Sequence, residues 1–85
     1  MAGLSYTVGS MPAKVTTDSA EAIRTVAEGL PVVLVNPDAA ALGRALAQAP
    51  DRDHGRRLMA VMVGDMADPA VAAAAGEMAA ELWPG

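Results

Sequence analysis

The chain has 85 residues, which fits one small domain. Its six basic and ten acidic residues give a formal net charge of −4, which argues against nucleic-acid binding. It contains no cysteine and one histidine, which excludes a disulfide framework, a thiolate zinc site and a histidine-rich metal site. Hydrophobic residues make up 53% of the sequence without a single phenylalanine, so small side chains must form the core and we expect a partner to complete it.

The first third of the chain has one uncertain segment. Residues 4–17 alternate loosely around a turn at 9–12, which predicts one broken strand or a loose hairpin. The segment 18–29 opens with Asp18-Ser-Ala-Glu21, a capping box, and ends at Gly29, so local propensity favours a helix there. Its apolar residues also alternate as in a strand, and both possibilities stay open.

The firmest element is a strand over 31–35, where four apolar residues follow a proline. Asn36 is a good N-cap and Pro37 suits the first helical position, so we expect a helix to begin here. The apolar stripe of this helix ends near Ala49, and residues 50–55 form a polar connector.

The second uncertain segment is 58–63, an unbroken apolar run. It fits a helix opened by Asp53, and it fits a buried strand equally well. Asp68 and Pro69 repeat the N-cap and proline pair, which predicts a last helix that runs to about Leu82.

These two segments decide between two folds. A strand at 18–29 with a helix at 58–66 gives a small antiparallel sheet followed by three helices. A helix at 18–29 with a strand at 58–63 gives a minimal βαβαβα unit with a parallel sheet. Local propensity alone does not separate them.

The stretch Val32–Ala40, Val-Val-Leu-Val-Asn-Pro-Asp-Ala-Ala, resembles the strand-to-helix junction of PqqD-like RiPP recognition elements, such as the leader-peptide-binding proteins of lasso-peptide clusters. A polar gap, an amphipathic helix, an Asp-Pro junction and a last helix follow at spacing close to that of the family, so the resemblance extends over 32–82. It implies an α+β, winged-helix-like fold, with a small N-terminal antiparallel β-sheet followed by three helices. We therefore expect a single domain over 1–85, mainly strands in 1–35 and three helices in 36–83.

The resemblance implies a non-catalytic peptide-binding module. It would capture the leader peptide of a precursor peptide by β-strand addition and present it to a protease or modifying enzyme. The strand at 31–35 would be the receiving edge, and the last helix would be the wall of a groove. The peptide-binding residues expected on this basis are Val32, Val33, Leu34, Val35, Val71, Ala74, Ala75, Met78 and Leu82. Glu77 and Glu81 would lie at the rim and pair with basic leader residues.

No catalytic constellation, cofactor site or metal site is visible, so we expect neither enzymatic activity nor a bound cofactor. His54 could act as a general base, but a histidine in a charged connector is typical of a solvated loop. In the parallel alternative, polar residues would gather at the strand ends, where such folds bind ligands: Asn36, Asp38, Asp65 and Asp68. Four methionines fit either core filling or an adaptable apolar surface: Met59, Met62, Met66 and Met78.

The competing function goes with the parallel fold. It is a small protein-interaction or regulatory protein that self-associates through its apolar sheet, with a homodimer as the expected assembly. No apolar run approaches the roughly 18 residues of a membrane span, and Met1–Tyr6 has no features of a signal peptide. We therefore expect a cytoplasmic protein without membrane or nucleic-acid partners.

Overall fold

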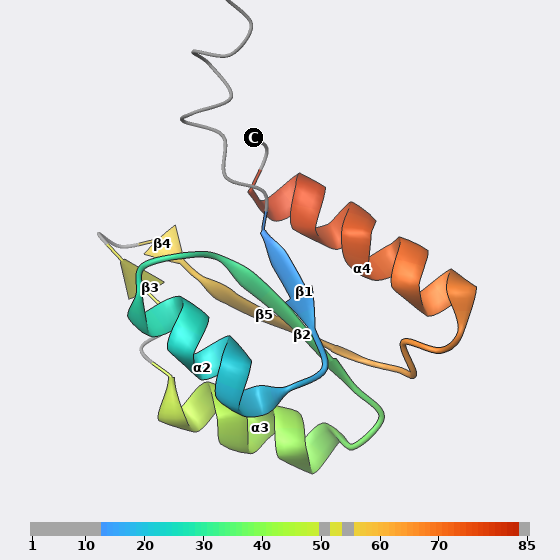
Figure 1. Ribbon diagram of the computed structural model, residues 1–85, viewed down its shortest axis with the longest axis horizontal. Coiled ribbons are helices and arrows are strands. Elements are labelled where there is room, and N and C mark those ends of the chain that lie inside the picture. Colours follow the sequence, from blue (N-terminus) through green and yellow to red (C-terminus); the bar gives the residue numbers. More distant parts are fainter. Residues whose placement is uncertain (1–12, 50–51, 54–55, 84–85) are drawn as a thin grey trace, which may run out of the picture.

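The computed structural model describes residues 13–49, 52–53 and 56–83, in which a three-stranded sheet lies between two layers of helices (Figure 1). The elements in chain order are β1 (Lys14–Thr16), α2 (Ser19–Ala27), β2 (Val32–Asn36), α3 (Ala39–Gln48), β3 (Arg52–Asp53), β4 (Arg56–Arg57), β5 (Met59–Val63) and α4 (Pro69–Leu82). The sheet has the order β1-β2-β5, and β3 and β4 form a separate antiparallel ladder.

The antiparallel sheet expected from the resemblance is wrong. β1 pairs with β2, and β2 with β5, both in parallel register, so that Val15 lies opposite Val33 and Val33 opposite Ala60. Both uncertain segments take the states of the alternative prediction, the βαβαβα unit, since 19–27 is helical and 59–63 is a strand. The division into strands and then three helices fails too, because helices and strands alternate along the chain.

α2 forms where its local signals predict it. The Asp18 side chain accepts hydrogen bonds from the N–H groups of Ala20 (3.0 Å) and Glu21 (3.4 Å), as an N-cap does. Gly29 follows the helix with a φ of 83°, a left-handed conformation that glycine adopts without strain. The helix therefore begins and ends as its sequence indicates.

The start of α3 lies two residues later than expected. Asp38, not Asn36, is its N-cap, and the Asp38 side chain accepts from the N–H of Ala40 at 2.9 Å. Asn36 remains the last residue of β2, and its side-chain oxygen accepts from the N–H of Asp38 at 2.8 Å. The predicted start of α4 is confirmed, with Asp68 as N-cap and Pro69 as the first helical residue.

β2 is buried on both faces because helices cover both sides of the sheet (Figure 1). On one face α2 and α3 enclose the first core: Ala22, Val26, Val32, Leu34, Leu42, Ala45, Leu58 and Met59. On the other face α4 encloses the second: Val33, Val35, Ala75, Ala79 and Trp83. The Trp83 indole N–H donates to the carbonyl oxygen of Arg57 at 2.9 Å, which fixes the end of α4 beside the start of β5.

The turn between β5 and α4 is tight. A Cβ on Gly64 would lie 2.8 Å from Cγ1 of Val71, so the close approach of the two elements depends on glycine. None of the described helices has both the length and the hydrophobicity needed to cross a membrane.

Candidate functional site

β5 is an edge strand, and within the described ranges no strand pairs with its outer side. Its five residues, Met-Ala-Val-Met-Val, include no charge and no proline, and its register with β2 runs without a bulge. Val63 at its end is 61% exposed. Natural edge strands usually carry lysine, proline or a bulge, or are very short, which prevents pairing with other chains. Met59 at the start of β5 is fully buried, but the part of the strand from Val61 to Val63 is accessible and has no lysine, proline or bulge, so this part is open to pairing.

Backbone hydrogen bonds show which peptide groups of β5 face outward. The N–H of Val32 donates to the Leu58 carbonyl (2.8 Å), and the N–H of Gly64 donates to the Asn36 carbonyl (3.1 Å). Peptide groups alternate in direction along a strand, so those of the even-numbered residues face β2. The N–H and C=O groups that point away from β2 belong to Met59, Val61 and Val63. Met59 is fully buried, so the accessible groups are those of Val61 and Val63. They form a row of donors and acceptors for one more strand.

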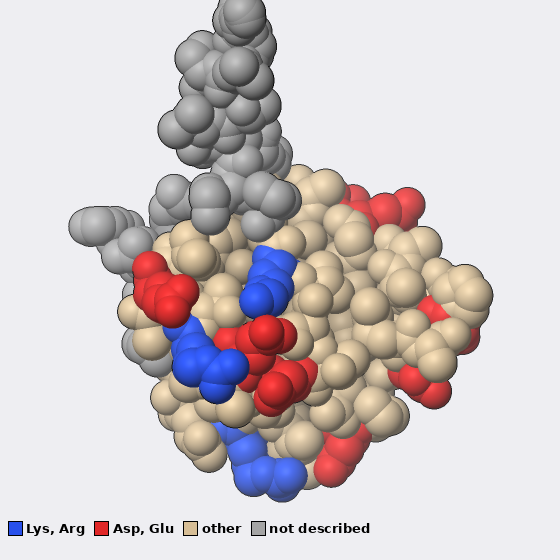
Figure 2. All heavy atoms as spheres, viewed as in Figure 1, with Lys and Arg blue, Asp and Glu red and all other residues tan. Residues whose placement is uncertain are grey.

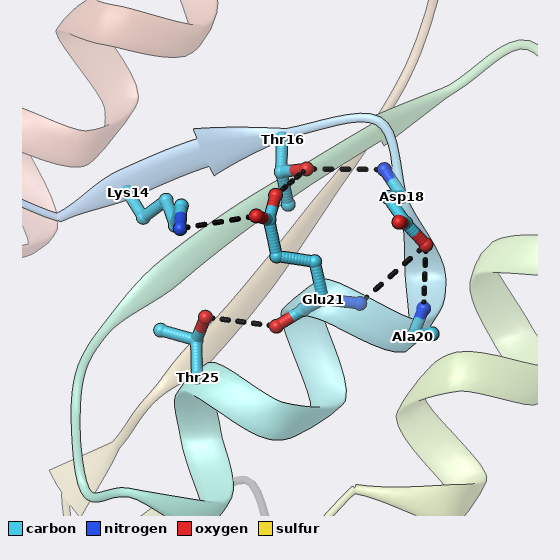
Figure 3. Close-up of polar contacts among 6 residues, drawn as sticks. All are labelled: Lys14, Thr16, Asp18, Ala20, Glu21 and Thr25. Atoms are coloured by element: carbon cyan, nitrogen blue, oxygen red, sulfur yellow. Dashed lines mark hydrogen bonds and ion pairs between the residues drawn. The ribbon is translucent and has the colours of Figure 1, made fainter.

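β1, the other edge of the sheet, is protected. It has three residues, and its exposed Lys14 forms an ion pair with Glu21, with Nζ 3.2 Å from Oε2 (Figure 3). A short strand with a lysine is a poor template for a further strand. The two edges of the sheet therefore differ in their capacity for pairing.

The polar contacts in Figure 3 join β1 to α2. The Thr16 hydroxyl donates to Oε1 of Glu21 (2.7 Å) and accepts from the N–H of Asp18 (3.1 Å). The hydrogen bond from Thr16, and then the ion pair with Lys14, lower the pKa of the Glu21 carboxyl. Only half of the predicted capping box is present, because Glu21 bonds to β1 instead of reaching back to the N-cap. This network holds the edge strand in place and offers no reactive group.

The polar residues at the strand ends serve as turn and helix caps. Asp18, Asp38 and Asp68 cap the three helices of the described residues, and Asn36 accepts the N–H two residues ahead of it. Asp65 does the same for Ala67, at 2.9 Å. Carboxylates at the helix N-termini take the place of an anionic ligand and repel phosphate. No three His, Cys, Asp or Glu side chains of the described segments are grouped so that they could hold a metal ion.

The structure leaves no room for the predicted peptide groove, because α4 packs directly on the sheet. β2 has β1 on one side and β5 on the other, so neither of its edges can receive a peptide. Four of the predicted peptide-binding residues are fully buried in it: Val32, Val33, Leu34 and Val35. Ala75 is also buried, and Val71 and Met78 are half-buried in the same core. These residues are packing residues of the domain.

The remaining predicted site residues lie on the exposed surface of α4. Ala74 is exposed, Leu82 is 50% exposed, and Glu77 and Glu81 are exposed on the same helix without a groove beside them. In Figure 2 the Lys and Arg side chains lie over β1, α2 and α3, whereas the surface over α4 is uncharged apart from acidic patches. The predicted groove residues thus divide between the core and the outer face of one helix.

The other candidates from the sequence add no site. His54 lies outside the described residues. Met59 is fully buried, and the other three methionines are half-buried against the core under α4, which fits core filling. The edge of β5 was missed because its signal, an uncharged apolar run at 59–63, is the same for a central strand and an edge strand.

Compared with known proteins, the sequence matches no family model and no curated protein, and the structure matches no solved structure. The PqqD-like resemblance therefore receives neither support nor contradiction from relatives. The fold and the outer edge of β5 are what the function can be argued from.

Proposed function

We propose that this chain is a non-catalytic protein-interaction module that binds an extended segment of a partner as a fourth strand on the outer edge of β5. The observation that carries the proposal is the accessible edge at Val61 and Val63, with two outward N–H groups, two outward C=O groups and no charge. Strand addition remains the binding mode expected from the sequence, but β5 replaces β2 as the receiving strand.

Side chains on both faces of β5 support this mode of binding. Val61 and Met62 are half-buried on opposite faces of the sheet, and Val63 is mostly exposed. An added strand would cover the exposed parts of all three, so an apolar extended segment gains both main-chain hydrogen bonds and apolar burial. An apolar extended segment from any partner could bind in this way. The proposal therefore does not require that the partner is a leader peptide or that a processing enzyme takes part. The cytoplasm stays the proposed compartment.

The test uses a synthetic peptide with the sequence of residues 57–65, Arg-Leu-Met-Ala-Val-Met-Val-Gly-Asp, as an extended apolar probe. Added to isotope-labelled protein at low concentration, it should shift the amide resonances of 59–63. It should also slow hydrogen exchange at the outward amides of Val61 and Val63. Shifts confined to β1 or to α4 would contradict the proposal.

A matched control is the same peptide methylated on the backbone nitrogens of its two valines. Methylation removes two hydrogen-bond donors and leaves the side chains unchanged, so binding should weaken by about tenfold or more. Equal binding of the two peptides would show that they bind to the apolar surface through their side chains and do not add a strand to the sheet.

A further inference from the structure

We propose that the segment bound by β5 runs antiparallel to it and carries a lysine or arginine two residues before its first paired residue, beside Asp65 and Asp68. This inference rests on the proposed function, because it uses the same edge, and it adds the chemistry of the partner. The partner is an extended segment of another protein that has apolar residues at alternate positions and a basic residue ahead of them.

Burial limits how much of β5 an added strand can cover. Met59 at the start of the strand is fully buried, whereas Val61 is half-buried and Val63 is mostly exposed. An added strand therefore pairs with the second half of β5 and continues past its end, where Gly64 and Asp65 follow. This places one end of the bound segment beside the turn between β5 and α4.

The turn that the segment reaches is acidic. Asp65 and Asp68 are both exposed, and each accepts a backbone N–H through its Oδ1, from Ala67 and Ala70 respectively, at 2.9 Å. Residues 64–68 include no lysine or arginine. Figure 2 shows acidic side chains, and no basic ones, on the visible surface of the described residues where β5 leads into α4. This end of the edge therefore attracts a positively charged side chain and repels a negatively charged one.

The small number of residues available for pairing favours the antiparallel orientation. In an antiparallel pair Val61 and Val63 each exchange two hydrogen bonds with one opposite residue, and antiparallel pairing is slightly more stable per residue than parallel pairing. Because the two chains then run in opposite directions, residues that precede the one opposite Val63 lie beside residues that follow Val63. A basic residue two positions earlier in the partner therefore lies next to Asp65.

The faces of β5 set the rest of the pattern. Val61 packs against the core under α2 and α3, and the alternation of side chains along a strand places Val63 on the same face. Partner residues opposite these two valines have their side chains on that face too, so apolar residues there would cover the exposed parts of both. The partner residue between them lies on the other face, near Met62. The expected order in the partner is thus basic, any residue, apolar, any residue, apolar.

Two blocked peptides of the same composition test orientation and charge together. The forward peptide is acetyl-Lys-Ser-Val-Thr-Val-Ser-amide, and the reverse peptide is acetyl-Ser-Val-Thr-Val-Ser-Lys-amide. Titrated into isotope-labelled protein, the forward peptide should shift the amide resonances of Val61 and Val63 and should bind about threefold more tightly than the reverse peptide at low salt, as expected for a surface ion pair. The preference should disappear at about 1 M salt, where charges are screened beyond about 3 Å.

Variants of the protein test the two carboxylates. Asp65→Asn and Asp68→Asn keep the side-chain oxygen that accepts the backbone N–H, so the turn and the helix cap remain while the charges are lost. The double variant should bind the forward and reverse peptides equally. Asp18→Asn is the matched control, because Asp18 caps α2 beside β1, at the other edge of the sheet. Its loss of charge should leave the threefold preference unchanged.

The outcomes separate this inference from the proposed function. Equal binding of the two peptides at β5, tighter binding of the reverse peptide, or a preference that the double variant retains would overturn the inference and leave the proposed function standing. Binding of the 57–65 peptide at β5 without binding of either hexapeptide would have the same meaning. Absence of binding by all three peptides would overturn both.

Discussion

Glu21 links strand, helix and turn through one carboxylate. Its two oxygens bind Thr16 and Lys14 of β1, while its own carbonyl accepts a hydrogen bond from the Thr25 hydroxyl at 2.8 Å (Figure 3). The side chain is on the surface, so each contact is worth little in water. Together they hold a three-residue edge strand that has few contacts of its own.

The lowered pKa of Glu21 makes a pH-dependent prediction. Its folded pKa lies below the ordinary value of 4.5, so the ionised form stabilises the fold above pH 4.5, and this stabilisation is lost as the pH falls through the folded pKa. Glu21→Gln should therefore lower the free energy of unfolding at neutral pH by a small amount. The difference from wild type should shrink below pH 4.5 and then vanish.

Urea unfolding followed by the fluorescence of Trp83, the single tryptophan, measures this difference. Glu28→Gln, at the other end of α2, is the control for removing one surface carboxylate. A wild-type advantage that stays constant between neutral and acidic pH would contradict the role assigned to Glu21.

Among the elements, α4 depends most on small side chains. Ala75 is fully buried against the sheet, over Val33 and Val35, while Ala74, its neighbour in sequence, is exposed. Helices rich in alanine can approach a sheet closely because there is no bulk to hold them away. That close packing is why no groove exists where the sequence predicted one.

This packing predicts opposite outcomes for two neighbouring substitutions. Ala75→Leu should lower the free energy of unfolding by about 1–3 kcal/mol, because the larger side chain has no space under α4. Ala74→Leu should change it by no more than about 0.5 kcal/mol, since its side chain points to solvent. Chemical denaturation of the two variants at one concentration makes the comparison. Equal stabilities would mean that α4 is not seated on the sheet as described.

Local signals identified the elements well, and non-local pairing was what the sequence left undetermined. Asp18 and Gly29 marked α2 correctly, and Asp68 marked α4. The unbroken apolar run at 59–63 is typical of a strand in a parallel sheet, but the residues that decide its state lie in β2, far away in the sequence. The resemblance over 32–82 favoured a helix at 58–66 and a strand at 18–29. The local sequence of 18–29 favoured a helix, and that prediction was correct.

The position of the candidate edge in the sheet could not be predicted from the sequence. The resemblance implied strand addition at 31–35, and strand addition itself stays a proposal. Only the strand order shows that β2 is central and β5 is peripheral. The apolar runs at 31–35 and 59–63 are similar in composition, so no local feature shows which of them is the central strand and which is the edge strand.

On the scale of the whole molecule, the protein is a small sheet with one protected and one unprotected edge. A chain of this size buries a modest fraction of its surface, so it gains proportionally more from a partner than a larger domain would. The sequence-based expectation that a partner completes the core takes a specific form here. The core under the helices is filled, and what remains incomplete is the sheet.

Strand addition at β5 predicts that the 57–65 peptide raises the melting temperature, Tm, of the chain. A partner that binds only the folded chain stabilises it in proportion to the logarithm of its concentration. At a concentration one hundred times its Kd, this peptide should therefore raise Tm by about 10 °C or more for a domain of this size. The peptide methylated on its two valine nitrogens should raise Tm much less at the same concentration. A Tm that this peptide leaves unchanged would contradict binding to the folded edge of β5.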